Sequence, residues 1–186
     1  MRLQCFFLAV IVSTSGSFSG AAEPDQPSPP EYEEVKRVIE YSIGWAVEKD
    51  FEKMFATWAQ DEHLYHHWLT SKSTTHGFAE FEAHSKSWED PKFKGTTYEF
   101  RDLEITFSRS GDVAWYSCRL DDCYEYDGKP GCVENVHQTG VLEKRDGRWV
   151  HVLMHGSYPV DEIPIEYVTR YYKDALAESA GKAGDD

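Results

Sequence analysis

Apolar residues recur at helical spacing in three segments of the first half of the chain. In residues 31–48 they follow the steps of three and four that place side chains on one face of a helix. The same spacing runs through 51–58, where Asp50 is placed to cap the first turn, and through 78–88, where Asp90-Pro91 ends it. We therefore expect three helices, each with an apolar face to bury. These faces are Val35, Val38, Ile39, Ser42, Ala46; Phe51, Met54, Phe55, Trp58; and Phe78, Phe81, Ser85, Trp88.

The second half of the chain changes to the two-residue alternation of apolar and polar side chains that is typical of strands. Turn sequences at Ser110-Gly111, at 128–131 and at Asp146-Gly147 divide it into consecutive antiparallel strands. Strands are expected over 95–108, 112–126, 132–145 and 148–158. The remaining expected elements are a short strand over 63–70, a turn over 70–77 and an amphipathic helix over 163–179.

Four stretches carry a resemblance to a known family: DVAW (112–115), LDD (120–122), TGVLEKRDGRWV (139–150) and MHGS (154–157). In wording and spacing, residues 33–158 resemble the SnoaL-like branch of the nuclear-transport-factor-2-like, ketosteroid-isomerase-like superfamily. The resemblance implies an α+β fold, in which a curved antiparallel sheet forms a cone around N-terminal helices and leaves a ligand cavity open at one end. It names no reaction, because isomerases, cyclases, dehydratases and pure binding modules share this scaffold.

The N-terminus differs from everything that follows it. Arg2 precedes the apolar run CFFLAVIV (5–12), and small residues follow up to Ala22, which is the pattern of a cleaved secretory signal and too short for a membrane span. We therefore expect an exported protein, periplasmic or extracellular, without a membrane anchor. The expected organisation is a signal peptide over 1–22, a Pro-rich, acidic and disordered leader over 23–32, one SnoaL-like domain over 33–160, and a C-terminal helix and tail over 161–186.

Export would place the cysteines in an oxidising compartment, where a pair is expected to be bridged. If the hairpin turns at 127–130, Cys123 and Cys132 lie nearly opposite each other, whereas Cys118 lies farther down its strand. A Cys123–Cys132 disulfide is therefore favoured, with Cys118 as a buried free thiol. Three free thiols are the alternative.

Composition narrows the function without naming it. The chain has 186 residues, which suits one domain with a hydrophobic core. Its formal net charge of −14 argues against nucleic acid, whose phosphates require a basic surface. The 6 Trp, 11 Tyr and 10 Phe would suit either a ligand pocket or a densely packed core. No cofactor is expected. Cones of the resembled family commonly pair, so we expect a homodimer through the outer faces of strands 95–108 and 132–145.

Two histidines on neighbouring strands are the candidate catalytic residues. A symmetric register about Asp146-Gly147 brings His137 and His155 close together, and an imidazole in the cavity could move a proton. The resemblance implies a basic residue at position 137 and an aromatic residue at position 156. This chain has His137 and Gly156 there, which puts a transferred anion-binding role in doubt. The full set expected to bind the ligand is Tyr41, Trp45, His66, Trp68, Tyr98, Trp115, Arg119, His137 and His155.

Carboxylates are the second candidate group, because acid–base enzymes of the resembled superfamily use one in an apolar pocket. Asp121 and Asp122 stand at the far end of a predicted strand, and Glu104 lies on another. For the two aspartates, a solvated strand end beside the disulfide is the favoured interpretation.

A run of histidines resembles a set of metal ligands: His63, His66 and His67, with His76 farther along the chain. Strand alternation puts His63 and His67 on one face and His66 on the other, so the three cannot converge, and no metal is expected. His66 and Trp68 would instead face inward beside the first helix, with His76 over the mouth of the cavity.

The favoured hypothesis is an exported domain that binds a small, largely apolar organic molecule without catalysis. The alternative is a small acid–base enzyme of the isomerase, dehydratase or hydrolase type, with His137 or His155 working against a carboxylate. A metal-dependent activity through His63, His66 or His67 comes third. A buried His–carboxylate pair in the cavity would favour the enzyme, and a lining of Trp and Phe alone would favour binding.

Overall fold

The computed structural model of the protein describes residues 29–159. The elements are α1 (Pro29–Glu48), α2 (Phe51–Ala56), β1 (Tyr65–His67), the 3₁₀ turn η1 (Ser71–Ser73), β2 (Thr74–His76), α3 (Phe78–Ser85), the 3₁₀ turn η2 (Lys86–Glu89), β3 (Phe93–Phe107), β4 (Val113–Tyr126), β5 (Lys129–Arg145) and β6 (Arg148–Ser157). Residues 29–32, expected in the leader, form the start of α1. The expected signal peptide and the helix at 163–179 lie outside the described residues.

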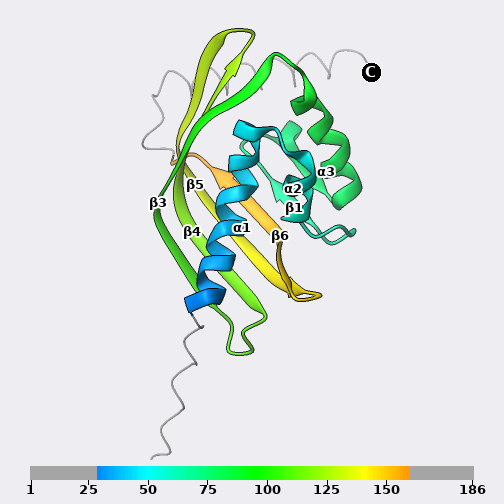
Figure 1. Cartoon of the computed structure of the whole chain (residues 1–186), viewed down its shortest axis with the longest axis vertical. Helices are drawn as coiled ribbons and strands as arrows, with labels where there is room; N and C mark the ends of the chain where they lie inside the picture. Colours follow the sequence, from blue (N-terminus) through cyan, green and yellow to red (C-terminus); the bar gives the residue numbers. More distant parts are fainter. Residues whose placement is uncertain (1–28, 160–186) are drawn as a thin grey trace, which may run out of the picture.

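The strands form one curved six-stranded sheet in the order β2-β1-β6-β5-β4-β3. Figure 1 shows the long strands β3 to β6 curving around α1, while α2, α3 and β1 gather at one end of the sheet. The α+β fold with a curved sheet around N-terminal helices is thereby confirmed. The sheet is not entirely antiparallel, because β1 runs parallel to β6.

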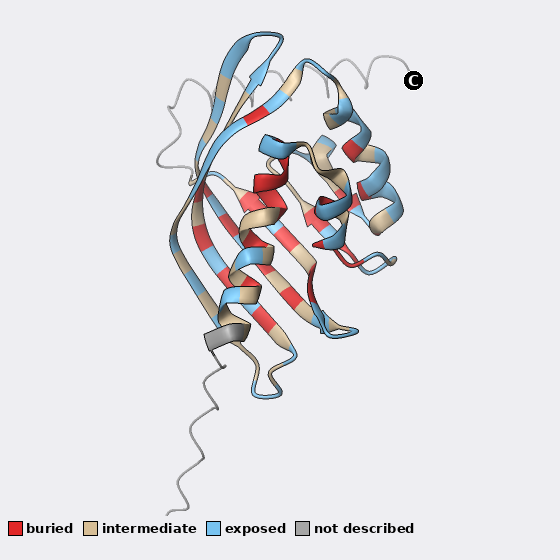
Figure 2. Ribbon diagram, in the orientation of Figure 1, coloured by how far each residue is buried: buried red, intermediate tan, exposed pale blue. Residues whose placement is uncertain are grey.

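Helix α1 lies on the concave side of the sheet, where the inner sheet face buries the apolar stripe of the helix. Ser42 and Ala46 are buried as helical spacing predicted, and Val35 and Ile39 pack against Tyr116 and other inward residues of the sheet. Figure 2 shows the buried positions in red along α1 and along the sheet face that it covers. Burying one large aliphatic side chain of this kind contributes about 2 kcal/mol.

Bulges interrupt the long strands and decide which way the following side chains point. In β3 the register shifts at Asp102, and in β5 it shifts at Asn135; both residues have a positive φ, of 52° and 57°. In β6 the shift leaves Val152 without a partner on β5. Because strand side chains alternate with a period of two, each extra residue moves the residues that follow it to the opposite face.

The segment between α2 and α3 differs most from the sequence prediction. The short strand expected at 63–70 spans only Tyr65–His67, and the stretch expected to be a turn contains a second strand, Thr74–His76, paired with it. A strand of three residues offers too little alternation to be recognised. The predicted cap of α2 is confirmed, since the Asp50 side chain accepts a hydrogen bond from the Lys53 backbone N–H at 3.0 Å.

Cys123 and Cys132 lie directly opposite each other on β4 and β5 and form a disulfide, as predicted. The bridge closes the hairpin whose tip extends beyond the rest of the sheet in Figure 1. Cys118 is free and buried, and burial raises the pKa of its thiol to about 12. It therefore stays protonated and unreactive at neutral pH.

Candidate functional site: an aromatic cavity under helix α1

A cavity of ≈ 200 Å³ opens between the second half of α1, α3 and the inner face of the sheet. It is smaller than the roughly 300–1,000 Å³ usual for drug-sized ligands, so it suits a compact molecule. Its polar lining residues are Ser42, His66, Ser73, His84 and Asp122. Its aromatic lining residues are Trp45, Trp58, Trp68, Phe81, Trp88, Phe93 and Tyr124.

The aromatic wall is continuous. Ring contacts lead from Trp68 to His66 (6.4 Å between centroids), from His66 to Trp58 (5.4 Å) and from Trp58 to Phe81 (4.8 Å). Phe81 then contacts Trp88 at 6.1 Å, and Trp88 contacts Trp45 at 5.2 Å. Rings in mutual contact bury large apolar areas and hold one another in place. The wall is therefore preformed and apolar.

Asp122 brings a carboxyl group into this apolar wall. Within residues 29–159 its carboxyl has no hydrogen bond or ion pair, and burial alone raises its pKa to about 6. Near that pH both the neutral and the ionised form are populated, so the group is able to exchange a proton with a ligand or to pair with a positive one. This arrangement is the most distinctive chemical feature of the cavity.

The adjacent Asp121 has a structural role on the other face of β4. Its Oδ1 accepts hydrogen bonds from Arg101 Nη2 at 2.8 Å and from the Asn135 backbone N–H at 2.7 Å. These contacts stabilise the bulge at Asn135. The solvated strand end favoured for both aspartates is therefore wrong: Asp121 is held in the sheet and Asp122 faces the cavity.

His66 is the other titratable group at the centre of the wall. It is 4% exposed, and its Nδ1 has no hydrogen-bond partner within the described part of the chain. Burial, reinforced by His84, His151 and His67, lowers its pKa to about 3, with the Ser73 backbone acting in the opposite direction. The imidazole is thus neutral at physiological pH and offers hydrogen bonding without charge.

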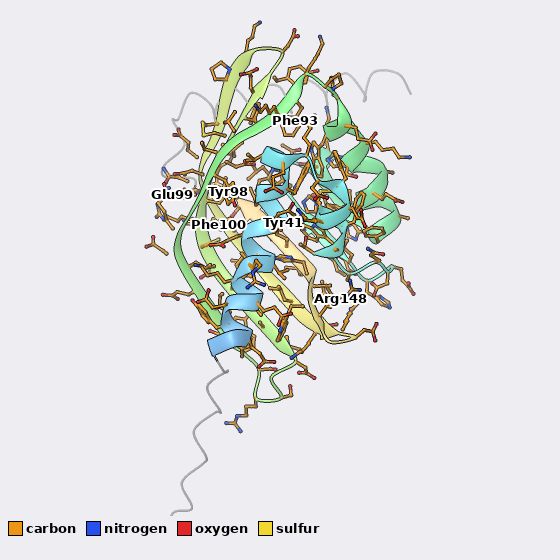
Figure 3. The ribbon with its side chains drawn as sticks, viewed as in Figure 1. Tyr41, Phe93, Tyr98, Glu99, Phe100 and Arg148 are labelled. Atoms are coloured by element: carbon orange, nitrogen blue, oxygen red, sulfur yellow. A yellow bond between two sulfur atoms is a disulfide. The ribbon has the colours of Figure 1, made fainter. Side chains whose placement is uncertain are left out.

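Of the nine residues expected to bind a ligand, Trp45, His66 and Trp68 line the cavity. Tyr41, on α1, and Tyr98, on β3, do not line the cavity, and Figure 3 shows both near the helix. The Tyr41 hydroxyl donates to Glu48 Oε2 at 3.0 Å. The Tyr98 hydroxyl lies over Gly44, where an added Cβ would be only 2.6 Å away, so a larger residue at position 44 would displace the Tyr98 ring.

The other four, Trp115, Arg119, His137 and His155, lie on the convex face of the sheet, and their predicted orientation into the cavity is wrong. Trp115 is 47% exposed, and both histidines are exposed, whereas their strand neighbours Tyr116, Gln138 and Met154 are buried. The two histidines are diagonal neighbours, since His137 lies opposite Ser157 and His155 opposite Thr139. Ligand contact by any of the nine stays a prediction.

The bulge at Val152 explains the error on β6. Strict alternation would put His151 and His155 on one face, but the extra residue between them sends His151 into the core and His155 to solvent. His151 is 0% exposed, with Nε2 3.3 Å from the Tyr116 hydroxyl and Nδ1 3.3 Å from the Thr57 carbonyl oxygen. It ties the sheet to the end of α2 and does not reach the cavity.

The sequence analysis named Asp122 as a candidate carboxylate but favoured a solvated position for it, and it did not include several aromatic residues of the wall, although a signal was present. On β4 the alternation of Ala114, Tyr116, Cys118 and Leu120, all buried, continues to Asp122. Extending the inward face along the strand would have placed its carboxyl in the cavity.

His66 and His67 lie on opposite faces of β1, as strand alternation predicted. His66 faces the cavity, whereas the rings of His67 and His76 meet at 5.3 Å and both lie near Tyr65. His76 therefore pairs with β1 and does not lie over the cavity mouth. Over residues 29–159, no group of three potential ligands is close enough to hold a metal ion.

Solved structures with similar folds come from several bacteria. A protein with a cystatin-like fold from Nostoc punctiforme aligns over 76% of this chain and 99% of its own, with 12% identity and a TM-score of 0.56. An NTF2-like protein from Novosphingobium aromaticivorans aligns over 73% and 86%, with 17% identity and a TM-score of 0.54. An NTF2-like protein from Pseudomonas putida aligns over 74% and 92%, with 17% identity and a TM-score of 0.56. At these identities the likeness concerns the fold alone.

Comparison with curated proteins finds no match. Comparison with family models matches residues 35–161 to the SnoaL-like domain. That match begins within α1 and includes the aromatic cavity and the whole curved sheet. The chain therefore belongs to the SnoaL-like domain family, on an NTF2-like fold.

Proposed function

We propose that this protein binds a small, largely apolar organic molecule in the cavity under α1, with Asp122 as its polar anchor. The observation that carries this proposal is a carboxyl group set in an aromatic wall without a partner among the described residues. Asp122 is partly exposed, and a ligand that covers it would have to satisfy its carboxyl group. Trp58 Nε1 and His66 Nδ1 are buried without partners in residues 29–159, and a ligand hydroxyl could serve either.

Filling the cavity should abolish binding. Val133 lines the cavity from β5, and a Val133→Phe substitution would occupy space that a ligand needs. In ligand-observed NMR with a panel of small cyclic alcohols, phenols and amines, we expect hits with the wild-type protein that disappear in this variant. The matched control is Val47→Phe on the exposed side of α1, which should keep every hit. Hits that survive Val133→Phe would place the binding site elsewhere.

Acid–base catalysis in the same cavity is the second candidate function. It is favoured by the Asp122 pKa of about 6, which suits a general base, and by the neutral imidazole of His66 in the same wall. Exchange of an α-proton of an added small ketone in deuterated water, dependent on Asp122, would establish it. Binding without any such exchange across a panel of ketones would leave the protein a binding module.

We also propose that the protein is exported. The Cys123–Cys132 disulfide and the secretory pattern before Ala22 support this. None of the described helices is long and apolar enough to cross a bilayer. N-terminal sequencing of the protein from its native host should give a start near Glu23. A mature protein that retains its first residues in the cytoplasm would contradict export.

A homodimer through the convex face of the sheet is the third proposal. Trp115 is 47% exposed there, beside a hollow of ≈ 380 Å³ that Thr139, Val141 and Leu153 also line. An exposed apolar surface of this kind favours self-association. Light scattering should give twice the monomer mass for the wild type and the monomer mass for Trp115→Glu. A monomeric wild type at tens of micromolar would exclude the dimer.

A further inference from the structure

We infer that the ligand of this cavity is a small organic cation, such as a compact alkylammonium ion, held by the Asp122 carboxylate and the surrounding aromatic rings. This inference rests on the proposed binding function and names the chemical class of the ligand. The charge of the cavity and the chemistry of its rings favour a cation, and the cavity volume restricts that cation to a compact one.

Within residues 29–159, the cavity carries a negative charge without a positive one to balance it. Asp122 is the acidic residue among the described lining residues, and none of them is Lys or Arg. Lys49 is close by, but its Nζ donates to the Asp90 carbonyl oxygen at 2.8 Å and lies 5.7 Å from the Phe93 ring centroid. His66 is neutral at physiological pH. An ionised Asp122 is therefore uncompensated, and a cationic ligand would neutralise it in a low-dielectric site.

The wall has the chemistry that recognises cations without hydrogen bonds. Indole and phenyl rings present a negative face, and indole is the best of them, so an aromatic cage combined with one carboxylate suits an ammonium group. Trp45, Trp58, Trp68 and Trp88 all line this cavity. Both the negative ring faces and the Asp122 carboxylate would repel an anion. The net charge of −14 further favours the approach of cations.

The size of the cavity restricts the cation to a compact one. A volume of ≈ 200 Å³ admits a tetraalkylammonium ion with short substituents or a small amine, and excludes polyaromatic cations. The tight ring contacts of the wall, such as Trp45–Trp88 at 5.2 Å, leave little room for expansion.

Binding of such a cation should depend on pH through Asp122. Only the ionised carboxylate attracts the ligand, and its pKa is about 6, so affinity should rise as the pH increases through this value. The other titratable groups in the wall are His66, His84 and Tyr124. Because several groups in the wall are titratable, the contribution of Asp122 must be isolated by substitution.

Three compact probes of similar shape but different charge test the inference: tetramethylammonium, neutral neopentyl alcohol and anionic pivalate. Calorimetric titration of the full-length mature protein should show tetramethylammonium binding at least about tenfold more tightly than neopentyl alcohol, with no measurable binding of pivalate. Asp122→Asn should abolish most of this preference and flatten its pH dependence. Glu125→Gln removes one negative charge from the same strand outside the cavity and should leave both unchanged.

Other results of these titrations would distinguish failure of the cation inference from failure of the proposed binding function. If neopentyl alcohol binds as tightly as the cation and Val133→Phe abolishes that binding, the cation inference is overturned while the proposed binding function stands. If the cation preference persists in Asp122→Asn, the carboxylate is not its cause and the inference is likewise wrong. If none of the probes binds at millimolar concentration, both proposals fail. Should Asp122→Asn not fold, a wild-type affinity for tetramethylammonium that does not change with pH would overturn the inference alone.

Discussion

Replacing His151 with Ala should lower the free energy of unfolding by about 3–4 kcal/mol. The side chain is 0% exposed and fills space between Trp58, whose ring centroid lies 4.9 Å away, and Tyr116. Its removal leaves a cavity and also leaves the buried Tyr116 hydroxyl without this partner, whereas the Thr57 carbonyl oxygen keeps its hydrogen bond from the backbone N–H of residue 151 at 2.9 Å. Urea denaturation followed by circular dichroism would measure the change.

His155→Ala is the matched control, because it removes the same side chain from the same strand on the other face. His155 is exposed, so its loss should change the free energy of unfolding by no more than about 0.5 kcal/mol. The comparison tests the bulge at Val152 directly. Equal effects of the two substitutions, or a larger effect at His155, would mean that the alternation along β6 is uninterrupted and that the described register is wrong.

Acidification should destabilise the protein well before its exposed carboxylates are protonated. Burial lowers the pKa of His151 to about 4 and that of His66 to about 3, whereas both titrate near 6.5 in an unfolded chain. Below about pH 6.5 these two histidines are therefore protonated in the unfolded state but stay neutral in the folded state. The stability is full above that pH and is lost as the pH falls towards 4. We expect a net loss on the order of 3 kcal/mol over this interval.

Asp122 acts in the opposite direction over the same interval. Its folded-state pKa of about 6 lies above its ordinary value, so its protonation stabilises the folded state as the pH falls. Asp122→Asn should therefore make the loss of stability between about pH 6.5 and pH 4 steeper, and His151→Leu should make it shallower. Unfolding curves at a series of pH values would measure both. A wild-type stability that is constant over this range would contradict the buried, neutral state of the histidines.

The sequence predicted those parts of the fold that depend on local periodicity and on short-range register. The stripe of α1, the cap at Asp50 and the pairing of Cys123 with Cys132 all follow from spacing within one helix or one hairpin. Strand β2 escaped prediction because its three residues carry no periodicity, and its stability comes from pairing with β1.

The candidate site was harder to predict because bulges decide which face of each strand meets α1. One extra residue at Val152 moved His155 out of the expected pocket, and on β5 the apolar pattern allows either face to be chosen. His66 and Trp68 were placed correctly because β1 is short and uninterrupted. The position of Asp122 was difficult to predict because two consecutive aspartates at a strand end suggest a solvated segment. Only the alternation of buried residues along β4 shows that Asp122 faces inward.

The six tryptophans report directly on whether ligands bind in the concave cavity. Trp45, Trp58, Trp68 and Trp88 line it, Trp115 lies on the convex face, and Trp149 lies in the core at the other end of α1. In a proton–nitrogen correlation spectrum each indole N–H gives its own signal. Titration with tetramethylammonium, or with the best hit of the fragment panel, should shift the signals of the cavity tryptophans and leave that of Trp115 in place. Shifts confined to Trp115 would put the binding site on the convex face and exclude the concave cavity.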